Sequence, residues 1–233
     1  KVKEQFLKKT KSLDAGSIAD LFNEIIDIIG EDSYDEYFYG KTDDENFKYL
    51  VLMPPKDLYS LARVIQVRID VSKEWTNIQR LKKVYTECDV MGKIQNKMKL
   101  NAMLIDSLDL NVCPYCNRNY INTRIDREDS SKSSFGAQMD HFYSKDKYPI
   151  FSVCLYNFIP VCGVCNNIKR TADFKVYPFL EDKEKQHEVR FNYRYINLDD
   201  VELYFETSDE READMNAIKL GEAYAIHSSD VQN

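Results

Sequence analysis

The stretch CGVCNNIKR, residues 162–170, contains the second of two Cys-x-x-Cys pairs, and the fold prediction starts from these pairs. The first pair lies in CPYC at residues 113–116, and the run QMDHFYSKDKYP at 138–149 lies between them. Two such pairs can supply four thiolates to one tetrahedral Zn²⁺ ion, and Cys₄ is a common ligand set of structural zinc. We therefore predict a structural zinc site with the ligands Cys113, Cys116, Cys162 and Cys165.

Four polar residues near these cysteines are not needed by a Cys₄ site: Asp140, His141, Asn157 and Asn166. An imidazole with a pKa near 6.5 can be neutral at working pH and can accept a proton from water. Carboxylate and amide oxygens are ligands that Mg²⁺ and Mn²⁺ take in proteins. The set predicts a catalytic site that the zinc holds in place.

The order Asp-His, then Asn, then a Cys-x-x-Cys pair followed at once by Asn-Asn-x-Lys resembles the HNH endonuclease family. The residues that carry the resemblance are 113–170 of the 233-residue chain. Within that family the run looks like the PtuB-type nuclease subunits of bacterial anti-phage systems, both Septu and retron-associated. The resemblance implies a ββα-metal fold, in which a β-hairpin and a helix hold one divalent ion.

The resemblance also implies a role for each polar residue. His141 would be the general base that deprotonates water for attack on a phosphodiester. Asp140 and Asn166 would bind a catalytic Mg²⁺ or Mn²⁺, with Asn167 as the alternative to Asn166. Asn157 would brace the loop that orients His141. The products would carry a 5′ phosphate and a 3′ hydroxyl.

The charge distribution indicates a nucleic-acid partner only locally. A net charge of −7 argues against a general polyanion-binding protein. Residues 71–100 carry 7 basic and 3 acidic side chains, and residues 113–175 carry 9 and 6, whereas 176–233 carry 6 and 14. We expect nucleic acid, DNA more than RNA, to lie against the motif region. Candidate phosphate contacts are Lys145, Lys169 and Arg170, for which a solvated surface charge is the alternative.

Length and composition, with 43% hydrophobic residues, allow one large domain or two small ones. The predicted fold class is α+β. Residues 1–110 form a helical region without chemistry of its own, which serves as a scaffold or docks a partner. Residues 111–175 form the zinc-stapled HNH core, and residues 176–233 add a C-terminal β-hairpin and an acidic helix.

Several elements can be placed from local patterns. Ser17 is the expected N-cap of a helix that ends at Gly30, and a second helix runs from Asp57 to Arg68. A strand over 119–125 and a returning strand over 137–142 form the motif hairpin, and a helix opens at Cys165 or Asn166 and ends near Ala172. The second hairpin has strands at 189–195 and 201–206, and the acidic helix starts from Ser208.

Other classes of protein are excluded or disfavoured. No run approaches the 18 or more apolar residues of a membrane span, and the N-terminal KVKEQFLKKTK lacks the apolar region of a signal peptide. Four of the 6 cysteines have metal spacing, which leaves Cys88 and Cys154 as thiols and favours a reducing, cytoplasmic location. A chain that opens on Lys is expected to be part of a longer one.

Two functional hypotheses remain. The first is a metal-dependent HNH endonuclease, and the second is a zinc-stapled module that binds nucleic acid or protein and cuts nothing. Asp140 and His141 together with Asn166 favour the first, because a binding module gains nothing from an adjacent base and a pair of oxygen ligands. The anti-phage resemblance further implies an ATPase partner of the SMC/ABC type, docked by the helical region or by the acidic C-terminal helix.

Overall fold

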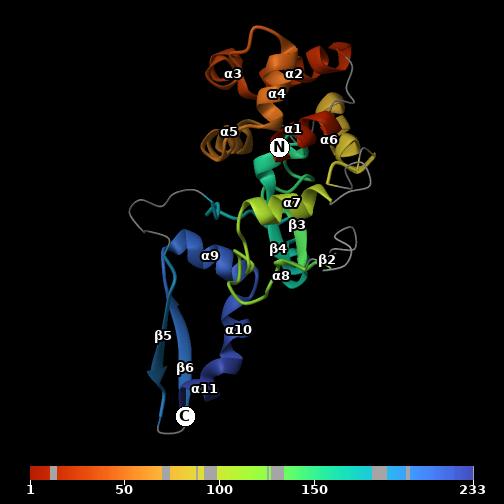
Figure 1. Cartoon of the computed structure of the whole chain (residues 1–233). Coiled ribbons are helices and arrows are strands. Elements are labelled where there is room, and N and C mark those ends of the chain that lie inside the picture. The colour runs from red at the N-terminus through yellow and green to blue at the C-terminus, as the bar shows by residue number, and fades with distance from the viewer. Residues whose placement is uncertain are drawn as a thin grey trace.

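A computed structural model of the chain describes residues 1–10, 15–69, 74–87, 89–91, 99–124, 126, 134–179, 188–197 and 200–232. The fold class is α+β, as predicted. Figure 1 shows helices from the N-terminal part at one end, the motif region in the middle, and a hairpin with short helices at the other end.

The N-terminal part is helical, and its helices bury the apolar stripes that the sequence predicts. In α5, for example, Leu58, Leu61, Ala62 and Ile65 are each at most 2% exposed. The helices are α1 (Val2–Thr10), α2 (Ala15–Ile29), α3 (Glu31–Tyr37), α4 (Asp43–Val51), α5 (Pro55–Arg68), α6 (Thr76–Glu87) and α7 (Leu100–Ser107).

The predicted start of α2 is wrong, and its predicted end is confirmed. Ser17 lies inside the helix, which already begins at Ala15, so its side chain is not the N-cap. The helix ends at Ile29 because Gly30 has a φ of +81°, a left-handed conformation that glycine adopts without steric cost.

The motif region is built from two antiparallel strands and a helix. Strand β3 (Ala137–His141) pairs with β4 (Phe158–Cys162), with Asp140 opposite Ile159 and His141 opposite Phe158. Helix α8 (Gly163–Lys169) follows β4 directly. Between the two strands lie the short 3₁₀ helices η2 (Pro149–Phe151) and η3 (Leu155–Asn157).

This arrangement corrects the predicted hairpin. The strand over 137–142 does not return onto 119–125, because its hydrogen-bonded partner is β4. The predicted strand over 119–125 contains β1 (Thr123–Arg124), which pairs instead with β2 (Ser134–Phe135), in the stretch that was predicted to be the connecting loop. Residues 125 and 127–133, in the predicted connecting loop, lie outside the described residues.

The predicted bounds of the motif helix are also wrong. The helix begins at Gly163 because the Cys162 sulfur accepts a hydrogen bond from the Cys165 backbone N–H and caps the first turn. It ends at Lys169 because Arg170 has a left-handed φ of +48°. Cys162, one of the four predicted zinc ligands, is therefore also the N-cap residue of α8.

The C-terminal part matches the predicted hairpin and the predicted helix start. Strands β5 (Arg190–Tyr195) and β6 (Val201–Glu206) pair in antiparallel register, and the Ser208 hydroxyl caps α9 (Asp209–Ala217) through the Arg211 N–H. The predicted single helix is broken at Lys219, which has a left-handed φ of +54°. The remaining elements are α10 (Leu220–Tyr224), η4 (Ala225–His227) and α11 (Ser228–Gln232).

One continuous apolar core joins the helical region to the motif region. The ring of Phe6 in α1 lies 5.8 Å from the ring of Phe158 in β4, in an edge-to-face arrangement. The Cys154 thiol is fully buried, whereas Cys88 lies outside the described residues. Among the described residues, no helix combines the length and the apolar character that crossing a bilayer requires.

Candidate metal centre and polar cleft

The four predicted zinc cysteines form one cluster. Their sulfur atoms all lie within 4.8 Å of one another, and all four side chains are buried. Cys116 Sγ and Cys162 Sγ are 4.0 Å apart, close to the roughly 3.8 Å expected between two sulfurs of a tetrahedral Zn–S₄ site with Zn–S bonds near 2.3 Å. The cluster can hold a structural metal such as zinc.

Each cysteine pair lies on a turn that is fixed by backbone hydrogen bonds. In the first turn, the Cys113 N–H donates to the Asn119 carbonyl at 2.9 Å and the Asn117 N–H donates to the Cys113 carbonyl at 2.8 Å. The second pair spans the junction of β4 and α8, where Cys162 ends the strand. The cluster therefore ties the segment before the motif to the helix after it.

The four thiols are close enough to change one another's pKa values. Hydrogen bonding to Cys113 lowers the pKa of Cys116 to about 6, and hydrogen bonding to Cys113 also lowers the pKa of Cys162. Hydrogen bonding within the same cluster raises the pKa values of Cys113 and Cys165. Four crowded, buried thiols compete for protons, and a bound Zn²⁺ would take all four as thiolates.

The C-terminal helices lie against the first cysteine turn. The Tyr224 hydroxyl donates to the Cys116 carbonyl at 2.8 Å, and the Arg118 guanidinium donates to the Ala223 carbonyl at 2.8 Å. Because each of these bonds joins α10 to the first cysteine turn or the residues just after it, the position of α10 depends on the folding of that turn.

A polar cleft of about 300 Å³ opens beside the motif strands. Asp140, His141 and Asn166 all line it, so the fold brings these three predicted residues together. The remaining lining residues come from α6, from β3 and the loop after it, and from the end of α8: Tyr85, Met139, Ser144, Lys145, Asp146, Arg170 and Thr171.

His141 ends β3 and is held by one hydrogen bond and two rings. Its Nε2 lies 3.1 Å from the Ser152 carbonyl oxygen, which can only accept, so Nε2 carries the proton. The ring packs against Tyr85 at 4.7 Å and Phe158 at 4.6 Å. Burial lowers the pKa of His141 to about 4, so the imidazole is neutral at pH 7. In that form Nδ1 carries the lone pair.

Asp140 faces a buried lysine and a buried tyrosine. Its Oδ2 lies 2.9 Å from Lys169 Nζ and accepts a 2.7 Å hydrogen bond from the Tyr115 hydroxyl. Burial raises the pKa of Asp140, and the Lys169 ammonium opposes that shift. Lys169 and Tyr115 both contact Oδ2, and neither contacts the other carboxylate oxygen of Asp140, Oδ1.

Lys169 is not the surface phosphate contact that the sequence predicts. Its side chain is fully buried, its ammonium also donates to the His141 carbonyl at 3.1 Å, and it lies 5.3 Å from the centre of the Phe174 ring. That prediction is therefore wrong, because the charge is already paired inside the protein. Lys145 and Arg170 do line the cleft.

The two asparagines are placed differently. The Asn157 side chain is fully buried and accepts from the Tyr143 N–H at 2.8 Å, while its Nδ2 donates to the carbonyls of Tyr143 and Phe151. It thus bridges the two ends of the loop between β3 and β4. Asn166 Nδ2 donates to Gln138 Oε1 at 2.7 Å, which leaves its Oδ1 as an acceptor. Asn167 is exposed and is not among the residues that line the cleft.

Sequence reasoning missed three residues of the site. The helical region, for which no chemistry was predicted, contributes Tyr85 to the cleft and pairs Lys82 with Asp146 at 2.7 Å. Tyr115 lies inside CPYC but was not assigned a role. The excess of basic residues over 71–100 was the one signal that pointed to α6. The aromatic residues of the loop after β3, Phe142, Tyr143 and Tyr148, are buried.

Comparison with known proteins confirms the predicted resemblance to PtuB. Over 107 residues the chain is 34% identical to the Septu protein PtuB of Bacillus thuringiensis, a match that covers 45% of this chain. The match spans 36% of that protein's own length. No family model matches the chain, and no solved structure matches it.

Proposed function

We propose that the protein is a metal-dependent HNH endonuclease that hydrolyses phosphodiester bonds of nucleic acid, with DNA favoured over RNA. The observation that carries the proposal is the state of His141 in the cleft. A buried, neutral imidazole whose Nε2–H is committed to a carbonyl presents Nδ1 as a base beside two oxygen ligands.

His141 acts first in the proposed reaction. Nδ1 takes a proton from a water molecule in the cleft, and the resulting hydroxide attacks the scissile phosphorus in line with the departing 3′ oxygen. The rings of Tyr85 and Phe158 hold the imidazole plane, and the Ser152 carbonyl fixes its tautomer. Asn157 keeps the loop that carries Ser152 in register through its three side-chain hydrogen bonds.

Asp140 and Asn166 are the proposed ligands of a catalytic Mg²⁺ or Mn²⁺. Each has one oxygen left after its protein hydrogen bonds, Asp140 Oδ1 and Asn166 Oδ1, and both residues line the same cleft. Two protein oxygens fit a hard cation that completes its shell with water and phosphate oxygens. When bound, such a cation stabilises the negative charge that develops on the phosphate.

Lys145 and Arg170 are the proposed phosphate contacts. Both line the cleft, Arg170 is exposed and Lys145 is half-buried. Neither has an ion pair among the described residues, so their charges are free to face a substrate phosphate. The two carboxylates at the cleft are already paired, Asp140 with Lys169 and Asp146 with Lys82. The cleft can therefore accept a polyanion despite the net charge of −7.

The proposed biological role is that of the effector subunit of an anti-phage system, in the cytoplasm and with an ATPase partner. The similarity to the Septu protein PtuB supports it. The acidic C-terminal part is a candidate contact surface, because Phe191, Tyr193 and Tyr195 of β5 are about half exposed or more. Co-expression with an ATPase of the SMC/ABC type tests this role, and failure of the two to co-purify counts against it.

A binding module that cuts nothing is the competing function, and the nuclease proposal is tested by cleavage. Plasmid DNA and a structured RNA are incubated with the protein and Mg²⁺ or Mn²⁺, and the blank contains a chelator in place of the added metal. Wild type is expected to cut, and His141→Ala is expected to lose activity.

His227→Ala is the matched control. His227 is half-buried in the C-terminal part, pairs with Asp230 at 2.8 Å and does not line the cleft, so its loss leaves the cleft untouched. Cleavage that survives in His141→Ala assigns the base to another residue. If a folded, zinc-loaded wild type with its partner cuts neither substrate, the protein is a binding module.

A further inference from the structure

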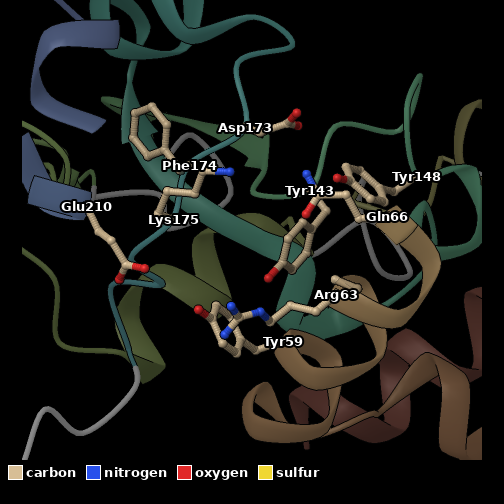
Figure 2. A pocket seen from close by; sticks show the side chains of 10 residues that line it. Tyr59, Arg63, Gln66, Tyr143, Tyr148, Asp173, Phe174, Lys175 and Glu210 are labelled. Atoms are coloured by element: carbon tan, nitrogen blue, oxygen red, sulfur yellow. The ribbon is translucent and has the colours of Figure 1, made fainter. Parts of the chain in front are cut away.

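A second pocket lies where the helical region, the motif loop and the C-terminal part meet (Figure 2). We call it the junction pocket; its volume is about 180 Å³. That is room for several water molecules or for one small polyatomic ion. Its polar lining residues are Tyr59, Arg63, Gln66, Tyr143, Tyr148, Asp173, Lys175 and Glu210.

Hydrogen-bond donors dominate this pocket, and several have no partner among the described residues. The Tyr143 side chain is only 8% exposed, yet its hydroxyl makes no hydrogen bond within the described part of the chain. Figure 2 shows that hydroxyl pointing toward Tyr59 and Arg63. Burial raises the pKa of Tyr143, so the hydroxyl stays protonated and remains a donor.

Two cations face the same space without a carboxylate partner among the described residues. The Arg63 guanidinium lies 5.6 Å from the centre of the Tyr59 ring and has no ion pair in the described part of the chain. The same is true of the Lys175 ammonium, whose backbone N–H is held by Asp214. An arginine fork, an ammonium and a phenol are the donor types that bind phosphate oxygens.

The pocket is also lined by two acidic residues. Asp173 is paired through Oδ2 with Lys147 at 2.8 Å, and Glu210 is the other carboxylate. Arg63 and Lys175 therefore match the two carboxylates of the lining in number, and Lys147, which lies outside the lining, pairs with one of these carboxylates. Asp173 Oδ1 is buried and has no hydrogen-bond partner in the described ranges, so the pocket also contains an acceptor that requires a donor.

We propose that the junction pocket binds a terminal phosphate group, either of a free nucleotide or of a nucleic-acid 5′ end. Arg63, Lys175 and Tyr143 donate to the phosphate oxygens. A phosphate monoester, with a second pKa near 6, retains one proton in part of its population at neutral pH, and that proton satisfies Asp173 Oδ1. The size of the pocket suits a chain end better than a backbone that must pass through it.

The test is calorimetric titration of the full chain, without added divalent metal, with four probes. These are inorganic phosphate, AMP, and one short oligonucleotide with and without a 5′ phosphate. Wild type is expected to bind phosphorylated probes. Arg63→Gln and Tyr143→Phe are each expected to weaken binding by at least about tenfold, because each removes a donor to a charged oxygen. Arg63 is exposed, and Tyr143→Phe removes only a hydroxyl that has no hydrogen bond to any residue the structure describes, so both variants are expected to fold.

Two controls locate the binding. Lys56→Gln, exposed on the same helix but outside the pocket, is expected to bind like wild type. Arg170→Gln removes a cation of the polar cleft instead. Binding of AMP and phosphate identifies a free nucleotide, and binding of only the 5′-phosphorylated oligonucleotide identifies a strand end. The proposal is overturned if no probe binds, or if binding is lost in Arg170→Gln and kept in Arg63→Gln. Because binding is measured without cleavage, these outcomes do not depend on the proposed nuclease activity.

Discussion

Lys169 Nζ lies 2.9 Å from Asp140 Oδ2, and both side chains are buried. The pair joins α8 to β3, the two elements that carry the candidate metal ligands. Lys169 also donates to the His141 carbonyl, and Tyr115 donates to the same Asp140 oxygen. A single buried cation thus fixes the orientation of the Asp140 carboxylate and the backbone of the proposed base.

Lys169→Met is expected to lower the free energy of unfolding by about 3–5 kcal/mol, because it leaves the Asp140 carboxylate buried without its partner. Chemical denaturation followed by circular dichroism measures the loss. Lys145→Met, half-buried and without an ion pair among the described residues, is the matched control and should change the value by less than about 0.5 kcal/mol. Adding Asp140→Asn to Lys169→Met should restore part of the stability. Equal stability of Lys169→Met and wild type would show that the carboxylate is hydrated.

Asn157→Ala is expected to destabilise the protein by about 2–5 kcal/mol, because it leaves one buried N–H and two buried carbonyls without their side-chain partner. It should also reduce cleavage, since the loop that holds Ser152 against His141 loses its brace. Thermal unfolding and the plasmid assay measure the two effects. Asn23→Ala, exposed on α2, should leave both unchanged. If Asn157→Ala is less stable but cleaves at the wild-type rate, the hydrogen bonds of Asn157 stabilise the loop without being needed to orient His141.

The sequence predicted the parts of this site that depend on short spacing. The two Cys-x-x-Cys pairs each fix two ligands within one turn, and the structure brings all four sulfurs together. The alternation of β5 and β6 and the cap at Ser208 are equally local signals, and their bounds are nearly as predicted.

The errors concern contacts between residues far apart in the chain. Strand β3 could have paired with residues on either side, and only the packed core selects β4 as its partner. Lys169 follows the zinc pair in a polar run that is typical of a surface, and burial against Asp140 and Phe174 is a tertiary property. Tyr85 reaches His141 from a helix 56 positions earlier, a contact that no periodicity within α6 encodes.

Removal of the metal is expected to loosen α10 as well as the motif strands. Purified protein should contain one zinc per chain by elemental analysis, and Cys116→Ser should lose most of it, because four thiolates are needed to close the site. Hydrogen exchange should then quicken in α10, whose Tyr224 donates to the Cys116 carbonyl. Cys154→Ala, buried but outside the cluster, should keep its zinc. Zinc retained at wild-type level by Cys116→Ser would contradict the Cys₄ assignment.

Glu24 of α2 caps the helix that carries Tyr85, and its loss should reach the cleft. Its carboxylate accepts from the backbone N–H groups of Asn77 at 3.0 Å and Ile78 at 2.9 Å, at the positive end of α6. Glu24→Ala should cost about 1–2 kcal/mol of stability, as the loss of a charged N-cap does. Because Tyr85 packs on His141, the variant should also cut more slowly at a temperature where it is folded. Asp27→Ala, exposed on the same helix, should match wild type in both assays. A Glu24→Ala variant that is less stable but cuts at the wild-type rate would show that the site does not depend on the start of α6.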